Sequence, residues 1–182
     1  MTQPSSAPLL VALLAAIPCL GCDGSFRTDD GRSAGSALGE TAPTLAGKTI
    51  DGERLALSDL RGQVVLVNIW ATWCKPCNQE LPELARLHDE LAPKGFTVLG
   101  VSVDKRQALG QVHGKIQQHG LRYPMLFDPE GVAVSGWNVV GYPTSVLVSR
   151  DGTLLWRRNG MIHPNDPELA KQIDAALAHR AP

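Results

Sequence analysis

A near-continuous apolar run, residues 64–73, ends abruptly at two cysteines, Cys74 and Cys77. A run of this length that is rich in Val and Ile predicts a strand buried on both faces of a sheet. Residues 78–91 then place leucines at helical spacing, which predicts an amphipathic helix. The two cysteines are therefore expected where a central strand passes into a helix.

Strands and helices alternate along the rest of the chain. The dipeptide Asp51-Gly52 predicts the turn of an N-terminal hairpin within residues 41–60. Further strands are predicted at residues 96–103, 144–149 and 154–158, and residues 123–127 are expected to be extended. Further helices are predicted at residues 107–119, within residues 132–140 and from residue 165. A strand, a helix and a strand in succession imply parallel pairing, whereas hairpins are antiparallel. The predicted fold class is α/β, with a mixed central sheet flanked by helices and the outline ββαβαββα.

The first 22 residues differ in kind from the remainder. Residues 9–17 form an apolar stretch of signal-peptide length, shorter than the ~20 residues of a membrane span. The stretch leads into Leu20-Gly21-Cys22, which resembles a bacterial lipobox, although Cys19 stands where such boxes usually carry Leu. We therefore expect residues 1–22 to be a signal peptide with Cys22 as a lipidation site. An ordinary cleaved signal or an uncleaved anchor stays open as an alternative.

Residues 23–40 contain few large apolar side chains and predict a flexible linker with a reach of roughly 20–25 Å. Residues 41–182 are then expected to form one folded domain. Together with the leader, this organisation predicts a periplasmic or other extracytoplasmic protein that a lipid or the signal itself anchors to a membrane.

Composition narrows the function. The chain has 182 residues, 19% of them charged, and a formal net charge of −1, so nothing suggests a nucleic-acid partner. Its four cysteines are too few for a disulfide scaffold. Its five histidines are scattered and supply no second ligand pair for a structural zinc site. We expect neither a metal nor a cofactor, and a monomeric protein.

A Cys-x-x-Cys pair after a strand is the usual signal of a redox-active dithiol. The N-terminus of a helix carries partial positive charge, which favours a thiolate over a thiol. Pro76 is tolerated between the cysteines because N–H groups in a first helical turn lack partners within the helix. In thiol–disulfide exchange, we expect Cys74, at the helix start, to be the exposed attacking thiol and Cys77 to be shielded and to resolve the intermediate.

Three motifs resemble the TlpA/ResA-like thioredoxins: Trp-Cys-Lys-Pro-Cys at residues 73–77, Glu-Leu-Pro at residues 80–82, and Gly-Tyr-Pro-Thr at residues 141–144. The resemblance spans roughly residues 41–160. It implies a thioredoxin-like fold with a central insert before residue 143. It also implies an exported, membrane-tethered thiol–disulfide oxidoreductase that reduces protein substrates with electrons from a membrane partner. The substrate, apocytochrome c, a copper site under assembly or another target, stays open.

The resemblance also assigns roles to single residues. Pro143 would be a cis-proline beside the dithiol. Thioredoxins proper carry a buried Asp where this chain has Asn68, which cannot take up a proton at neutral pH. Glu80 is the nearest replacement as a base, or else a solvated charge in the first helical turn. Trp73 and Tyr142 would form an apolar rim for a protein substrate, or else pack partly into the core.

Two further functions fit the same cysteines. A peroxiredoxin-like peroxidase is the nearest rival on this fold, but its cysteine follows Thr-x-x, whereas Thr72 is only two residues before Cys74. A Cu(I)-carrying or copper-site assembly protein could use the dithiol as a soft metal ligand.

Overall fold

The structure is a computed structural model that describes residues 1–2 and 37–179. The predicted signal peptide beyond its first two residues, Cys22 and most of the predicted linker lie outside the described residues. Residues 37–40, assigned to the linker from the sequence, contact the domain: Gly39 N–H donates to Leu154 O (2.8 Å), and Leu154 N–H donates to Glu40 O (2.9 Å). Across the described part of the chain, no helix has both the length and the apolar character needed to span a bilayer.

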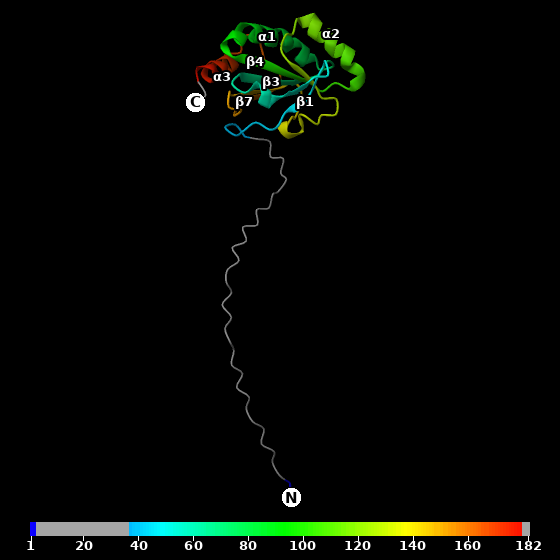
Figure 1. Cartoon of the computed structure of the whole chain (residues 1–182), viewed down its shortest axis with the longest axis vertical. Helices are drawn as coiled ribbons and strands as arrows, with labels where there is room; N and C mark the ends of the chain where they lie inside the picture. The colour runs from blue at the N-terminus through cyan, green and yellow to red at the C-terminus, as the bar shows by residue number, and fades with distance from the viewer. Residues whose placement is uncertain (3–36, 180–182) are drawn as a thin grey trace. The chain divides into compact units, whose positions relative to one another are not determined.

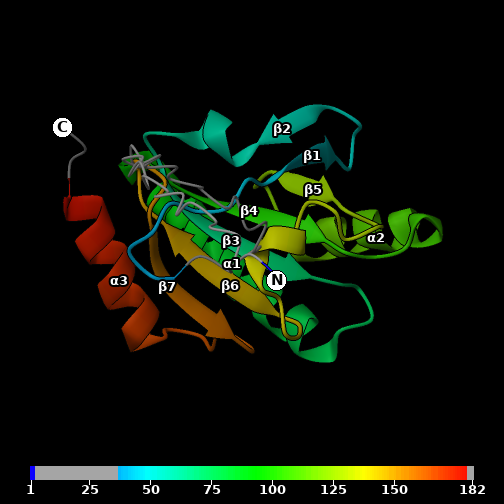
Figure 2. The same cartoon turned by 90° about the horizontal axis from the view of Figure 1, so that it is seen from below.

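Within residues 37–179, seven strands form one mixed sheet in the order β2-β1-β5-β4-β3-β6-β7, with β2 and β7 at opposite edges (Figure 2). The strands are β1 (Ala46–Thr49), β2 (Arg54–Ala56), β3 (Val64–Trp70), β4 (Phe96–Ser102), β5 (Met125–Phe127), β6 (Thr144–Val148) and β7 (Leu154–Asn159). Strand β4 is parallel to β3 and β5, and the other pairs are antiparallel. The predicted mixed sheet is confirmed.

The outline ββαβαββα is two strands short of the observed order βββαβαβββα. Strand β5 has only three residues, yet it pairs with both β4 and β1. It therefore joins the N-terminal hairpin to the central strands, so the hairpin and β3 belong to one sheet. Such a short strand owes its existence to its neighbours rather than to its own sequence pattern.

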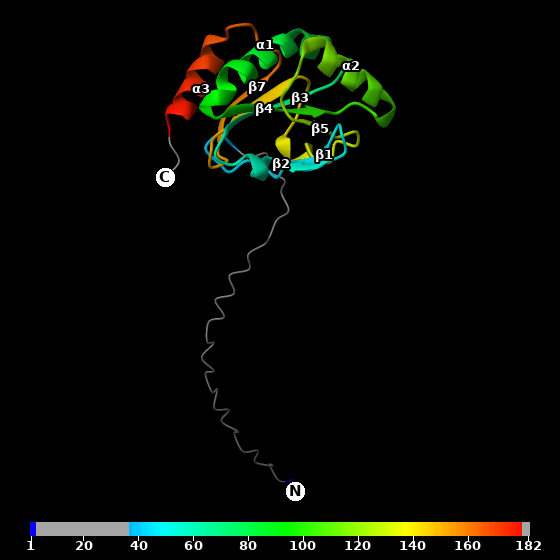
Figure 3. The same ribbon diagram turned by 45° about the horizontal axis from the view of Figure 1, so that its top comes forward.

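The three α-helices of the described part of the chain lie on the same side of the sheet (Figures 1 and 3). They are α1 (Lys75–Leu91), α2 (Leu109–His119) and α3 (Pro167–Ala178). Short 3₁₀ turns accompany them: η1 (Leu57–Leu60), η2 (Ala92–Lys94), η3 (Arg106–Ala108) and η4 (Ser135–Trp137). The cap of α3 is Asp166, whose side chain accepts from Leu169 N–H at 3.0 Å, as N-terminal carboxylates commonly do.

Each face of the sheet has its own apolar core. Under the helices, Leu81 and Leu84 of α1 and Ile173 of α3 pack against Leu66 of β3. None of the three α-helices covers the other face: Trp137 of the 3₁₀ turn η4 packs there together with residues of the segment before β3. All seven residues of β3 are buried, which confirms a central strand covered on both faces.

Candidate active site

The two cysteines lie at the junction that the sequence predicts. Strand β3 ends at Trp70, Cys74 is the N-cap of α1, and Cys74 and Cys77 form a disulfide with their Cα atoms 5.3 Å apart. The N–H of Cys77 donates to Cys74 Sγ at 3.2 Å. An N–H group of a first helical turn therefore points at this sulfur, which favours negative charge on it when the pair is reduced.

Neither cysteine is freely exposed. Cys77 is 0% and Cys74 5% exposed. Cys74 is thus the more accessible of the two in the disulfide, and the exposure of the Cys74 thiol in the reduced protein stays a prediction. Each sulfur in a disulfide covers part of the surface of the other. Trp73, which directly precedes Cys74, is an exposed aromatic residue, with 66% of its surface accessible.

The segment before β6 lies beside the cysteine turn. Thr144 of β6 pairs with Ile69 near the end of β3, so Tyr142 and Pro143 reach the same end of the sheet as the cysteines. The Tyr142–Pro143 peptide is cis, as expected. The rings of Trp73 and Tyr142 meet edge to face, with centroids 5.6 Å apart. The structure therefore brings together the predicted rim residues.

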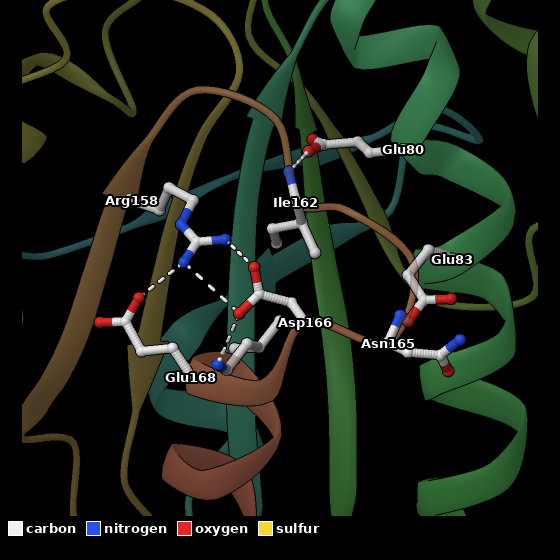
Figure 4. Close-up of polar contacts among 8 residues, drawn as sticks. Glu80, Glu83, Arg158, Ile162, Asn165, Asp166 and Glu168 are labelled. Carbon is white, nitrogen blue, oxygen red and sulfur yellow. Dashed lines mark hydrogen bonds and ion pairs between the residues drawn. The ribbon is translucent and has the colours of Figure 1, made fainter.

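Glu80 is a buried residue of the second turn of α1, only 1% exposed. Its Oε1 accepts from Asn68 Nδ2 at 2.7 Å. Its Oε2 accepts from Ile162 N–H at 2.7 Å (Figure 4). Asn68 Nδ2 also donates to Ser145 Oγ at 3.0 Å. The alternative of a solvated first-turn charge is wrong, because α1 has no acidic residue in its first turn.

Burial raises the pKa of Glu80 from 4.5 to about 7. The N–H of Ile162, the amide of Asn68 and the charge of Arg158 all lower the pKa of Glu80, but their combined effect is smaller than that of burial. Near neutral pH, Glu80 is thus able both to accept and to release a proton.

The loop between β7 and α3 packs on the side of α1 that carries Glu80 and Glu83. Besides the Ile162 contact, Asn165 N–H donates to Glu83 Oε1 at 3.1 Å (Figure 4). At the start of the loop, Gly160 N–H donates to Pro143 O at 2.8 Å. One short loop therefore touches both Glu80 and the cis-proline.

Ion pairs hold the end of this loop that leads into α3. Arg158 of β7 pairs with Asp166 and, at 2.6 Å, with Glu168 (Figure 4). The loop contacts have no signal in the local sequence, because Ile162 and Asn165 each lie 82 residues from their partners in α1. Only the spacing of Glu80 and Glu83, three residues apart on one helix, could have suggested paired carboxylates.

Comparison with known proteins now places the chain in a family. The AhpC/TSA family model matches residues 38–157. The chain belongs to the AhpC/TSA family. This AhpC/TSA protein is 34% identical over 129 residues to thioredoxin-like protein YneN of Bacillus subtilis, covering 71% of this chain and 75% of YneN. It is 31% identical over 132 residues to thiol-disulfide oxidoreductase ResA of Geobacillus kaustophilus, covering 72% and 75%.

A solved structure agrees with these relatives. A Chlorobium tepidum protein, provisionally named thiol:disulfide interchange protein DsbE, matches with a TM-score of 0.71 and 33% sequence identity, covering 78% of this chain and 98% of that one. The resemblance to the TlpA/ResA-like proteins is confirmed. This AhpC/TSA chain is a thiol–disulfide oxidoreductase of the thioredoxin-like type with a Cys-x-x-Cys pair.

Proposed function

We propose that the protein reduces disulfides in protein substrates, with Cys74 as the attacking thiol and Cys77 as the resolving thiol. The observation that carries the proposal is the environment of the two sulfurs. Cys74 Sγ accepts the Cys77 N–H at the positive end of α1, which favours its thiolate. Cys77 is fully buried, which disfavours its thiolate and keeps it protonated while Cys74 attacks.

The reaction follows from these two environments. The Cys74 thiolate attacks a substrate disulfide, forms a mixed disulfide and releases one substrate sulfur as a thiolate. Cys77 then loses its proton and attacks Cys74 Sγ, which breaks the mixed disulfide and releases the second substrate sulfur. Two electrons pass to the substrate, and the Cys74–Cys77 disulfide of the structure is the oxidised product. A dithiol donor must reduce it again before the next cycle.

Glu80 is the proposed acceptor of the Cys77 proton. The two residues are three apart in α1 and both are buried, so they lie on the same side of the helix. A base with a pKa of about 7 is suited to proton transfer at neutral pH. Asn68, which hydrogen-bonds Glu80, positions the carboxylate and cannot itself accept the proton.

Trp73, Tyr142 and Pro143 form the proposed substrate-binding rim. The exposed ring of Trp73 rests edge to face on Tyr142, and Val140, 75% exposed, extends the apolar surface along the same segment. Aromatic side chains that combine large contact area with few rotatable bonds are suited to protein recognition.

We further propose that the protein works in the periplasm or another extracytoplasmic compartment, tethered by a lipid on Cys22 or by its signal. The support is the apolar leader and Leu20-Gly21-Cys22. A membrane protein would then supply the electrons, and apocytochrome c is the substrate to test first, because TlpA/ResA-like proteins include cytochrome c maturation factors. We propose a monomer.

The peroxidase alternative is disfavoured by a contact. A peroxidatic cysteine needs a neighbouring hydroxyl directed at the bound peroxide. The Thr72 hydroxyl instead donates a hydrogen bond to Asp104 Oδ1 at 2.6 Å.

Trapping tests the proposal directly. With a disulfide-bonded apocytochrome c peptide, reduced Cys77→Ser protein should accumulate a mixed disulfide, because Cys74 attacks and nothing resolves the adduct. Cys74→Ser protein should accumulate none, because the remaining thiol is buried. Non-reducing gels and intact mass detect the adduct. Equal trapping by both variants contradicts the assigned roles, and trapping by neither contradicts the function.

A further inference from the structure

Asp104 is a buried carboxylate that dithiol exchange as described does not use. It follows β4 and is 0% exposed. A buried carboxylate is costly unless hydrogen-bond donors surround it. Thr72 N–H donates to Asp104 Oδ2 at 2.9 Å, the Thr72 hydroxyl donates to Oδ1 at 2.6 Å, and the Ser102 hydroxyl donates to Oδ2 at 2.9 Å.

The two contacts with Thr72 match a carboxylate. They use both oxygens of Asp104, one for the backbone N–H and one for the hydroxyl. An Asn at this position would offer one acceptor oxygen and turn a donor toward the other contact. Among residues 37–179 no ion pair involves Asp104, so neutral donors alone stabilise its charge.

A second side chain holds the same turn from the helix side. Asn78 Nδ2 donates to Thr72 O and to Cys74 O, both at 2.8 Å. The N–H, the hydroxyl and the carbonyl of Thr72 are therefore all hydrogen-bonded. We call Asp104, Asn78 and Thr72 the turn clamp. Trp73, between two clamped residues, is fixed at its backbone while its ring stays exposed.

We propose that Asp104 is a positioning residue for dithiol exchange: through Thr72 it fixes the turn that presents Trp73 and Cys74 to a protein disulfide. This inference rests on the proposed role of Cys74 as the attacking thiol. The turn determines whether Cys74 Sγ stays within reach of the Cys77 N–H (3.2 Å), the contact that favours the thiolate. It also determines whether the Trp73 ring stays on Tyr142.

The direction of change in Cys74 reactivity separates three roles for Asp104. If Asp104 positions the turn, loosening the clamp removes the N–H from Cys74 Sγ, and the thiolate forms at higher pH. If Asp104 acts through its negative charge, removing that charge makes the thiolate easier to form, at lower pH. If Asp104 only stabilises the fold, the pH of thiolate formation does not change.

The experiment compares four full-length variants with the wild type. Asp104→Asn removes one acceptor and the charge, whereas Thr72→Val removes only the hydroxyl and leaves the charge of Asp104 in place. Thr72→Ser restores the hydroxyl. Asp128→Asn is the matched control, because Asp128 is also a buried carboxylate after a strand, but it caps Val132 N–H and Val134 N–H, away from the cysteines in sequence.

Two readouts are measured on the reduced proteins: the pH midpoint of Cys74 alkylation by iodoacetamide, and the rate of attack on a protein disulfide relative to a small aromatic disulfide. We expect Thr72→Val and Asp104→Asn to raise the midpoint by about half a unit or more. We also expect about tenfold slower attack on the protein disulfide, with a smaller effect on the small one. Thr72→Ser and Asp128→Asn should match the wild type in both readouts.

An unchanged midpoint in Thr72→Val, or a lowered midpoint in both clamp variants, overturns the positioning role. Thr72→Val keeps the test open if Asp104→Asn fails to fold, because Val has nearly the shape of Thr. A wild-type protein that does not attack protein disulfides at all refutes the proposed function instead, and this outcome is seen before any variant is compared.

Discussion

Replacing Glu80 with Gln removes the charge of the side chain and keeps its size. The structure explains how the fold should tolerate this change. Gln offers one acceptor oxygen for Ile162 N–H and turns its amide toward Asn68. Asn68 Oδ1 is buried and without a partner among the described residues, so rotation of the Asn68 amide lets it accept from the new Gln amide.

Stability should respond to pH in a direction set by the raised pKa of Glu80. In the folded protein Glu80 keeps its proton up to a pKa of about 7, against an ordinary value of 4.5. A raised pKa means that stability present at low pH is lost as pH rises from about 4.5 through about 7. At about 1.4 kcal/mol per pKa unit, the loss is about 3 kcal/mol. The oxidised Glu80→Gln protein should lack this loss.

Urea unfolding of both oxidised proteins between pH 4 and pH 9 measures the difference. Glu83→Gln is the matched control: Glu83 lies one turn further along the same helix and also accepts a backbone N–H. The hydrogen bond from Arg86 lowers the pKa of Glu83, so its contribution to stability is present above its ordinary pKa and lost as pH falls. Above about pH 5, the free energy of unfolding of Glu83→Gln should therefore run parallel to that of the wild type, whereas Glu80→Gln should lack the fall between about pH 4.5 and pH 7.

The kinetics of thiol–disulfide exchange should also depend on Glu80. In single-turnover reactions with 5,5′-dithiobis(2-nitrobenzoate), Cys74 releases the first thionitrobenzoate, and attack by Cys77 releases the second. General-base catalysis contributes about 10²–10⁴-fold, so Glu80→Gln should slow the second release by about 10²-fold at pH 8. The inflection near pH 7 in the second release should disappear. Superimposable pH profiles in wild type and Glu80→Gln would refute Glu80 as the base.

Two further predictions concern the rim and the leader. Trp73→Ala should slow reaction with a protein disulfide by about tenfold, the value of about 1.4 kcal/mol for a lost aromatic contact, and leave reaction with a small disulfide unchanged; Leu38→Ala, also an exposed apolar residue, is the control, and an equal loss in both contradicts a rim. Intact mass of the membrane-extracted protein should give a mature chain that begins at Cys22 and carries lipid, in wild type and Cys19→Ser alike; a different first residue without lipid would contradict this.

Local patterns predict much of this molecule. The apolar run of β3 and the helical spacing of α1 each come from side chains close in sequence, so the position of Cys74 and Cys77 between them follows from one segment. The short strand β5 and its role in joining the hairpin to the sheet could not be read in the same way, because they depend on pairing with β1 and β4.

The environment of the site depends on contacts that no local pattern encodes. From the sequence, Glu80 fits a buried base and a solvated surface charge equally well. The structure shows it buried, because a loop 82 residues away covers it. The same holds for Thr72 and Asp104, which are 32 residues apart and meet only because β3 and β4 are parallel neighbours.

The reduction potential of the Cys74–Cys77 pair tests the central claim most directly. It can be measured by equilibrating the purified protein with glutathione or dithiothreitol mixtures and quantifying the disulfide by alkylation and intact mass. A protein that reduces substrate disulfides should have a potential near that of thioredoxin, about −270 mV. A potential near that of DsbA, about −120 mV, would make the pair an oxidant and contradict the proposed direction of electron transfer.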